Sequence, residues 1–179
     1  HGQIRKELSM QGYVQVYTGN GKGKTTAAFG LALRAAGANL KVFIGQFVKG
    51  GHYSELNSLA HLLEFVTIKQ FGLGFIYSQP TGEDYAIAQE GLKEINSIIY
   101  SQRYQVVILD EITIALKYNL VALEEVLDLI RNKPDSVELV LTGRDAPPEV
   151  IEEADLVTEM REIKHYASKG VSSRLGIEK

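Results

Sequence analysis

The chain has 179 residues, of which 45% are hydrophobic and 23% charged, a composition typical of an ordinary globular domain. Its formal net charge of -3, from 19 basic and 22 acidic side chains, gives no bulk attraction to nucleic acid or to an anionic membrane. The chain has no cysteine and no apolar run near the roughly 20 residues that cross a bilayer, so disulfides, thiolate zinc sites, a cysteine nucleophile and a spanning helix are excluded.

We expect one domain over residues 1–179, because this length suits one domain and is short for two. Residues 1–12 precede the first predicted strand and form a short N-terminal extension. Its first residues, His1-Gly2, resemble the remnant of a removed tag, and no signal-peptide pattern follows them. A cytoplasmic protein is the simplest interpretation.

Apolar runs alternate with helical patterns along most of the chain. Strands are predicted over residues 13–17, 41–47, 63–68, 105–109, 137–141 and 155–160. Helices are predicted over residues 27–36, 87–98 and 123–130, and a short one follows Pro147-Pro148 as far as Glu153. This alternation predicts an α/β fold of three layers, P-loop NTPase-like (RecA-like), with helices on both faces of a mostly parallel central sheet. Residues 164–179 show no clear period and form either a loop packed on the domain or an arm that reaches a partner.

The segment between the first strand and the first helix, TGNGKGKTT, carries the strongest functional signal. It matches the end of the pattern G-x-x-x-x-G-K-[ST], although Thr18 stands where that pattern has its first glycine. Glycines let successive amides turn inward around anionic oxygens, and the helix N-terminus adds positive potential. Lys24 is predicted to bridge phosphate oxygens and to act in catalysis, and the Thr25 hydroxyl to ligate Mg²⁺. The residues predicted to bind the phosphates of ATP are Thr18, Gly19, Asn20, Gly21, Lys22, Gly23, Lys24, Thr25 and Thr26. The alternative is a flexible Gly/Lys turn with no ligand.

Charged residues follow three other predicted strands. Asp110 and Glu111 end an apolar strand, and carboxylates at that edge of a parallel sheet can hold Mg²⁺ directly or through water. The alternative is a solvated acidic pair. Arg144 is either a guanidinium that stabilises phosphate charge or a surface arginine in a turn. Lys49 either helps to bind an anion or is solvated.

The stretch QFGLGFIY at residues 70–77 places aromatic side chains among glycines. Core packing is the default explanation, but a loop shaped for a flat apolar ligand is the alternative. The four histidines show no metal spacing, and no Ser/His/Asp arrangement is evident, so a zinc hydrolase and a serine hydrolase are unsupported.

Taken together, these segments resemble the P-loop type of corrinoid adenosyltransferase, from about Gly12 to the C-terminus. The segments that carry the resemblance are TGNGKGKTTAAFG, QFVKG, GFIY, LDEITIALKY, LTGRDAPPEVIEEADLVTEM, and KH with GIE near the end. The resemblance implies transfer of the 5′-deoxyadenosyl group of ATP to the Co(I) centre of a corrinoid, with triphosphate released. It also implies that ATP lies reversed along the phosphate loop, which fits the threonine at position 18.

The resemblance assigns roles to individual residues as well. Thr25 and Glu111 are the implied Mg²⁺ ligands with Asp110 close by, and Arg144 is implied to stabilise the triphosphate. Phe75 and Tyr77 match aromatic positions that shape the lower face of the corrinoid and favour a four-coordinate, more easily reduced cobalt. A tryptophan is common in the family where this chain has Tyr77.

The resemblance further implies a homodimer in which an N-terminal helix closes over the corrinoid, and here about a dozen residues precede the first strand. An electron-donor protein such as a flavodoxin is a candidate partner, whereas nucleic acid and membrane are not expected partners. Two other functions stay open: an ordinary P-loop ATPase or kinase that cleaves at the γ-phosphate, with Glu111 positioning a water or a hydroxyl, and a non-catalytic nucleotide-dependent switch.

Overall fold

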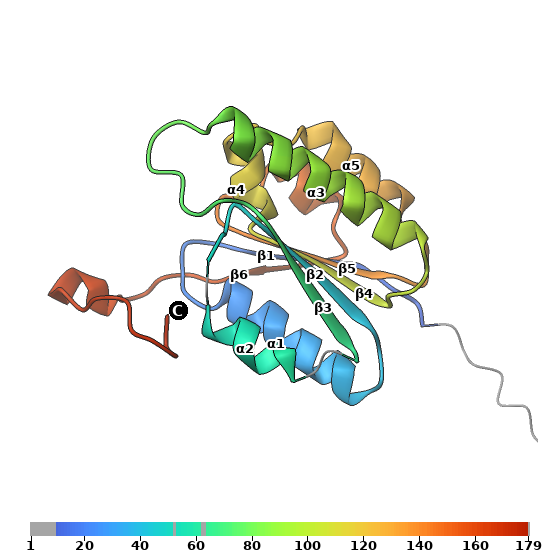
Figure 1. The fold of residues 1–179 in the computed structure, drawn as a ribbon, viewed down its shortest axis with the longest axis horizontal. Coiled ribbons are helices and arrows are strands. Elements are labelled where there is room, and N and C mark those ends of the chain that lie inside the picture. The colour runs from blue at the N-terminus through green and yellow to red at the C-terminus, as the bar shows by residue number, and fades with distance from the viewer. Residues whose placement is uncertain (1–9, 52, 62–63, 179) are drawn as a thin grey trace, which may run out of the picture.

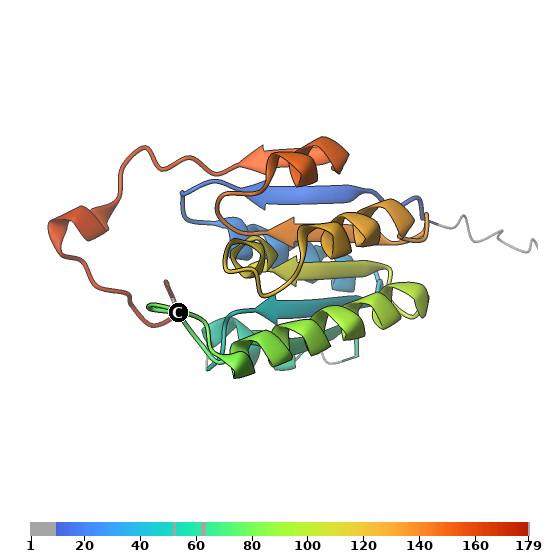
Figure 2. The ribbon, with the colours of Figure 1, turned by 90° about the horizontal axis from the view of Figure 1, so that it is seen from above.

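The computed structural model describes residues 10–51, 53–61 and 64–178. At its centre lies a six-stranded sheet in the order β3-β2-β4-β5-β1-β6, and every neighbouring pair of strands is parallel. The strands are β1 (Val14–Thr18), β2 (Val42–Phe47), β3 (Val66–Phe71), β4 (Val106–Asp110), β5 (Glu138–Thr142) and β6 (Leu156–Glu159). Because all six run the same way, their carboxyl ends meet at one edge of the sheet (Figure 2).

Helices cover both faces of this sheet (Figure 1). On one face lie α3 (Gly82–Tyr100), α4 (Ile112–Lys117), α5 (Leu123–Asn132) and α6 (Pro148–Glu153), and on the other lie α1 (Lys24–Gly37) and α2 (Ser54–Ala60). Each face has its own apolar core, one against α3 to α6 and one against α1. The predicted α/β, P-loop NTPase-like fold with a central parallel sheet is therefore confirmed. Within the described residues, no helix has the length and apolarity to cross a membrane.

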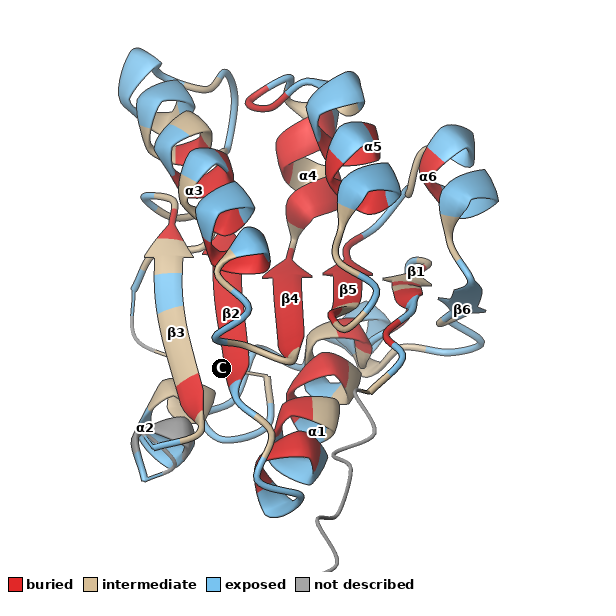
Figure 3. Cartoon of the chain, turned by 90° about the vertical axis from the view of Figure 1, so that its right-hand side faces the viewer, coloured by how far each residue is buried: buried red, intermediate tan, exposed pale blue. Residues whose placement is uncertain are grey.

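The strands β2 and β4 are buried on both faces (Figure 3). All residues of β2 and of β4 are buried, whereas all four residues of the edge strand β6 are exposed. Continuous apolar runs such as VVIL in β4 are typical of a parallel strand that is covered on both sides. Both strands therefore reach the carboxyl edge of the sheet through its most completely buried part.

Predicted and observed elements differ at β3, at α2 and α4, and at the start of α3, which lies at Gly82 rather than near residue 87. The predicted strand 63–68 starts at Leu63, outside the described residues, and the observed β3 continues to Phe71. The Phe71 ring is buried against Phe47, with ring centroids 5.5 Å apart, so this aromatic belongs to the core rather than to a ligand loop. Helices α2 and α4 were not predicted, because seven and six residues are too few to display a helical period.

The tail after β6 crosses the carboxyl edge of the sheet. It includes a short 3₁₀ helix, η1 (Tyr166–Lys169), and then returns toward the phosphate loop, where Lys22 contacts Ile177 and Glu178. Residues 164–179 combine the two interpretations: the end of the tail contacts the domain through Lys22, whereas η1 has no buried residue and Leu175 is 82% exposed.

Gly91 of α3 allows this helix to approach the sheet closely. A Cβ atom at this position would lie 2.4 Å from Phe71 Cγ and 2.7 Å from Phe71 Cβ, which are the rigid base of that side chain. Phe71 in turn packs on Phe47, so it cannot move away without disturbing the core between α3 and the sheet.

We predict that Gly91→Ala lowers the free energy of unfolding by about 1–3 kcal/mol, the usual cost of overpacking. This cost should outweigh the roughly 1 kcal/mol by which alanine favours a helix over glycine. Urea denaturation measures the difference. The matched control is Gly82→Ala in the same helix, where an added Cβ meets nothing within 4 Å. A Gly91→Ala protein as stable as the Gly82→Ala protein would contradict the packing argument.

Candidate active site

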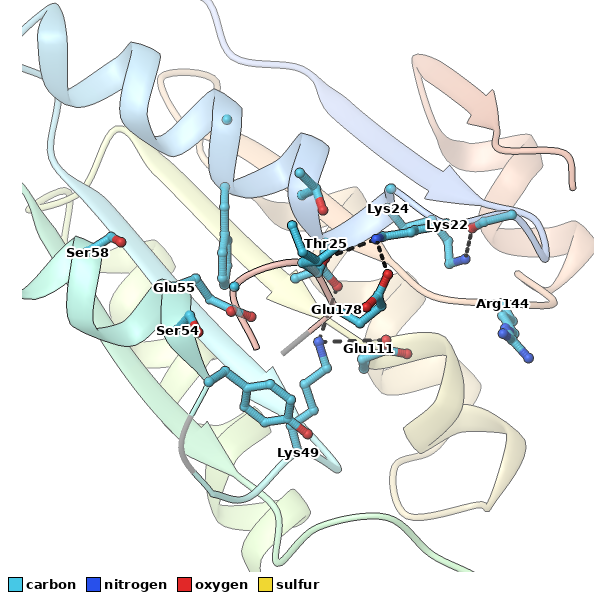
Figure 4. A pocket seen from close by; sticks show the side chains of 18 of the residues that line it. Lys22, Lys24, Thr25, Lys49, Ser54, Glu55, Ser58, Glu111, Arg144 and Glu178 are labelled. Carbon is cyan, nitrogen blue, oxygen red and sulfur yellow. Dashed lines mark hydrogen bonds and ion pairs between the residues drawn. The ribbon is translucent and has the colours of Figure 1, made fainter. Parts of the chain in front are cut away.

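A cavity of about 750 Å³ opens beyond the carboxyl ends of the strands. The loops that follow β1, β2, β4 and β5 each contribute charged or polar groups to its wall: the phosphate loop, Lys49, Glu111 and Arg144. The remaining wall comes from α1, α2, the aromatic loop before α3 and the end of the tail. Figure 4 shows Thr25, Lys49 and Glu111 gathered within this cavity, with Arg144 to one side.

The phosphate loop lies between β1 and α1, as the motif predicted. Residues 20–26 line the cavity, and Gly23 is the N-cap of α1 with φ 121°, a backbone angle that glycine adopts without strain. The back of the loop packs on the residue that follows β6: Gly21 N donates to Met160 O at 2.6 Å. An added Cβ at Gly19, whose φ is 95°, would lie 2.5 Å from the same carbonyl. The exposed edge strand β6 therefore supports the loop from behind.

Thr18, at the first glycine position of the motif, is buried at the end of β1. Its hydroxyl accepts a hydrogen bond of 3.1 Å from Ala146 N, in the loop between β5 and α6. Thr18 and Gly19 lie behind the cavity wall rather than in it. The threonine thus ties the phosphate loop to the loop that carries Arg144, a contact that a glycine cannot make.

The Lys24 side chain is largely buried, and its Nζ donates to Gly21 O at 2.7 Å, across the phosphate loop. Burial lowers the pKa of this ammonium, and the nearby Arg144 guanidinium lowers it further. Two cationic side chains therefore face one small volume, an arrangement that an anionic ligand would stabilise.

The Asp110 carboxylate, fully buried at the end of β4, accepts hydrogen bonds from four side chains. Thr25 and Thr142 hydroxyls donate to Oδ1 at 2.9 and 2.7 Å. Gln46 Nε2 and Lys49 Nζ donate to Oδ2, each at 3.2 Å. These donors belong to α1, β5, β2 and the loop after β2, so one carboxylate joins four elements at the active-site edge. With both oxygens engaged, Asp110 fits a supporting role behind a metal better than that of a direct ligand.

Glu111 faces the cavity from the turn between β4 and α4. Its φ of 60° is left-handed, which is uncommon outside glycine and recurs at functional sites. Its backbone N–H donates to Thr142 Oγ1 at 3.1 Å, which fixes the turn. Burial raises the pKa of this carboxyl and the neighbouring Asp110 carboxylate raises it further, partly offset by Lys49 at 3.9 Å.

Lys49 contacts three of the groups described above. Its Nζ lies 3.2 Å from Thr25 Oγ1 and 3.2 Å from Asp110 Oδ2, as well as near Glu111. Burial lowers the pKa of this ammonium, but the Asp110 and Glu111 carboxylates outweigh burial, and the pKa is raised. Sequence reasoning left Lys49 open between an anion ligand and a solvated side chain, and the structure shows an ion pair with the acidic residues instead.

The loop of Arg144 follows β5 and is fixed by α4. The Thr113 hydroxyl donates to Arg144 O at 2.6 Å, and an added Cβ at Gly143 would lie 2.0 Å from the Thr113 Oγ1 atom. Arg144 therefore borders the cavity with an exposed side chain.

The C-terminal segment supplies a wall that sequence reasoning did not assign. Lys22 Nζ donates to Ile177 O at 2.9 Å and to Glu178 Oε1 at 3.0 Å. Arg174 Nη2 also reaches Glu178 Oε1, at 3.0 Å, and Tyr166 Oη donates to it, so Arg174 and Tyr166 hold the pKa of this carboxyl well below its usual range. Gly176, Ile177 and Glu178 line the cavity. The GIE segment near the end was the only signal for this wall.

Comparison with known proteins places this geometry in a family. A family model described as ATP:corrinoid adenosyltransferase BtuR/CobO/CobP matches residues 10–178. The chain belongs to the ATP:corrinoid adenosyltransferase family. Corrinoid adenosyltransferases of Escherichia coli (strain K12) and Pseudomonas aeruginosa are 36% and 37% identical to it; each comparison covers 98% of this chain, and 90% and 88% of the relatives. A corrinoid adenosyltransferase of a Sinorhizobium species is 36% identical over 94% of this chain and 80% of its own length. The family predicted from the motifs is confirmed, and the chain is an enzyme of this adenosyltransferase class.

In this adenosyltransferase, the aromatic loop between β3 and α3 presents two rings to solvent. Phe75 is 68% exposed and Tyr77 94% exposed, and their ring centroids lie 6.5 Å apart. Phe75 lines the cavity, whereas Tyr77 lies outside its wall. Adjacent exposed aromatics of this kind are typical of a surface that receives an apolar ligand.

The oxygen donors at the carboxyl edge fit Mg²⁺. Thr25, Asp110 and Glu111 offer hydroxyl and carboxylate oxygens, the ligands that this hard cation prefers. The Lys49 ammonium of the adenosyltransferase already contacts these three groups. Among the described residues no group of three or more His, Cys, Asp or Glu side chains could hold a metal alone. A metal here would therefore depend on phosphate and water to complete its coordination.

We predict that Glu111→Gln raises the melting temperature in metal-free, nucleotide-free buffer at neutral pH. The raised pKa of Glu111 means that the folded protein pays a cost to keep this carboxyl charged. The cost is present above the folded pKa and disappears as the pH falls toward the ordinary value of about 4.3. The gain should therefore shrink on acidification, and thermal melts over a pH series measure it.

Glu152→Gln, at an exposed position of α6, is the control and should leave the melting temperature unchanged at every pH. A Glu111→Gln protein that melts lower than wild type at neutral pH would show that the Lys49 ion pair outweighs the burial of the carboxylate.

Proposed function

We propose that this chain transfers the 5′-deoxyadenosyl group of ATP to the Co(I) centre of a corrinoid, releasing triphosphate, in the biosynthesis or salvage of adenosylcobalamin. One observation carries the proposal: in a member of this family, the phosphate loop, Glu111 of the acidic pair and Phe75 of the aromatic loop line one cavity. The loop suits the triphosphate, the acidic pair suits Mg²⁺, and the aromatic loop suits the corrinoid.

The transfer is a displacement at carbon. The electron pair of Co(I) attacks C5′ of the ribose, the bond from C5′ to the phosphate oxygen breaks, and triphosphate leaves with the electrons of that bond. Charge grows on the leaving oxygen, so groups aimed at the phosphate chain accelerate the step. The loop amides, Lys24 and Arg144 are the groups of this chain that face that region. Mg²⁺ bound by Thr25 and Glu111, with Asp110 behind them, would add further positive charge.

No general base is required, because the attacking cobalt has no proton to lose. The protein's task is then to align two substrates, and alignment alone can be worth about 7–11 kcal/mol. The cavity wall formed by Phe75 and the C-terminal segment lies next to the phosphate loop, which fits a corrinoid held across from the nucleotide. Aromatic contact with the lower face of the corrinoid would favour four-coordinate cobalt.

We propose a single domain, a cytoplasmic homodimer, and reduction of the corrinoid by an electron-donor protein such as a flavodoxin. A lid formed by the N-terminal extension, residues 1–12, would fall mostly on residues 1–9, which lie outside the described residues. Sedimentation of the purified enzyme tests the dimer. Assays with cobalamin, cobinamide and a biosynthetic diamide identify the acceptor.

Product analysis tests the reaction itself. With ATP, Mg²⁺ and chemically reduced cobalamin, the proposal expects adenosylcobalamin by its absorption spectrum and one triphosphate per corrinoid by phosphorus NMR. Release of ADP and phosphate would favour the ordinary ATPase or kinase. ATP binding with no turnover would favour the nucleotide-dependent switch.

Lys24→Ala should lower the turnover number by about 10²–10³-fold, the usual effect of removing one group that stabilises transition-state charge. The circular dichroism spectrum should not change, because the ammonium bonds to the phosphate loop and not to the apolar core. Lys93→Ala, on the exposed face of α3, is the control. Wild-type turnover by Lys24→Ala would remove this lysine from the mechanism.

Phe75→Ala should impair adenosylation that starts from cobalt in its +2 state more than adenosylation of chemically prepared Co(I). The reason is that contact with the lower face is needed for reduction, whereas Co(I) is already four-coordinate. Tyr13→Ala, at an exposed position before β1, is the control. Equal losses in the two assays would argue against contact between Phe75 and the lower face of the corrinoid.

A further inference from the structure

The Lys49 ammonium lies among the groups that are proposed to bind Mg²⁺. Its Nζ is 3.2 Å from Thr25 Oγ1, 3.2 Å from Asp110 Oδ2 and 3.9 Å from Glu111 Oε1, and its side chain is only 13% exposed. A single cationic group of the protein thus contacts all three groups. Figure 4 shows this side chain reaching toward Thr25 and Glu111.

The backbone before Lys49 is strained in a way that places this side chain. Val48 has φ 65°, an outlying value for a β-branched residue. Lys49 N donates to Phe47 O at 2.6 Å, which closes a three-residue turn around Val48 of a rare and strained kind. The neighbouring loop enforces the turn: Gly74 N donates to Val48 O at 3.0 Å, and an added Cβ at Gly72 would lie 2.3 Å from the Val48 carbonyl carbon. Strain retained by such packing is typical of functional sites.

The carboxylates of Asp110 and Glu111 need a cation beside them even when no metal ion is bound. Asp110 is fully buried and Glu111 is its neighbour, so two carboxylates lie close together in a region of low dielectric. An unpaired buried charge is strongly destabilising. The Tyr53 ring, 5.4 Å from the ammonium, adds a weaker attraction to the face of an aromatic ring. Lys49 therefore neutralises the acidic pair in the nucleotide-free protein.

The ammonium and a metal ion compete for these oxygens. Lys49 donates to Thr25 Oγ1, whose own hydroxyl proton is already given to Asp110. The ammonium thus engages one of the two lone pairs of an oxygen that would ligate Mg²⁺. A metal ion bound to Thr25 and Glu111 would therefore lie close to the ammonium, in a largely buried region where like charges repel strongly. Each cation weakens the binding of the other.

We propose that Lys49 is the resident cation of the nucleotide-free enzyme, holds Thr25 and Glu111 in place as ligands, and exchanges with Mg²⁺ when the nucleotide binds. The inference rests on the metal site of the proposed function. The displaced ammonium, on the cavity wall, pairs with the incoming phosphate chain, so metal and ATP bind together and metal alone binds weakly. Lys49 is in this account a positioning residue.

Binding of Mn²⁺ alone, followed by the EPR signal of the free ion, tests the exchange. Lys49→Met should bind Mn²⁺ at least about tenfold more tightly than wild type, because the competing charge is gone. Lys49→Gln, which keeps a hydrogen-bond donor, should also bind Mn²⁺ more tightly than wild type, and it replaces Lys49→Met in the test if that variant folds poorly. Lys41→Met, at an exposed position before β2, should match wild type. In chelator, Lys49→Met should melt below wild type and recover on addition of Mn²⁺.

The possible results separate this inference from the proposed function. Equal Mn²⁺ affinity in wild type and both Lys49 variants would overturn the exchange. The double variant Lys49→Met/Glu111→Gln gives a second check. If it still binds Mn²⁺ more tightly than wild type, the ion lies elsewhere and the exchange is again overturned. If wild type with ATP binds Mn²⁺ while the Lys49 variants show no gain, the proposed metal site stands and only the exchange fails. If wild type binds no Mn²⁺ with ATP, the metal site and the exchange fail together.

Discussion

The active-site edge of this protein depends on one buried carboxylate. Asp110 accepts hydrogen bonds from the first turn of α1, from β2 and the loop after it, and from β5, while it sits at the end of β4. Three of these partners connect Asp110 to a functional group: Thr25 lies in the first turn of the helix after the phosphate loop, Lys49 supplies a cation, and Thr142 fixes the turn of Glu111. A buried charge that is fully hydrogen-bonded specifies one arrangement, because every alternative leaves it unpaired.

The parallel sheet brings these groups together at one edge. Six strands that run the same way deliver their following loops to one edge, and β2, β4 and β5 are held rigidly by apolar cores on both faces. Several features of the same region lower the stability of the folded protein. Left-handed backbone at Val48 and Glu111, a desolvated lysine at position 24 and two adjacent carboxylates all oppose folding locally. The packed strands supply the stability that retains them.

Much of this site could be predicted from sequence, because its signals are local. A strand, a glycine-rich turn and a helix start locate the phosphate loop, and an apolar run that ends in Asp110-Glu111 locates the acidic pair. The fold class followed from alternating periods. What could not be predicted depends on side chains far apart in the chain. The contact of Lys49 with Asp110 spans 61 positions, and that of Lys22 with Glu178 spans 156. Helix α4 is too short for its period to be read, and the left-handed turn of Glu111 has no sequence signature.

A crystal structure with ATP and Mg²⁺ is the most direct test of this account. We expect the polyphosphate to lie against the amides of residues 20–26, with Lys24 beside it. We expect the metal ion on Thr25 and Glu111, and Asp110 still hydrogen-bonded to Thr25 and Thr142. A polyphosphate bound away from this loop, or a metal on residues outside the Asp110 cluster, would contradict the claim that this carboxylate organises the site.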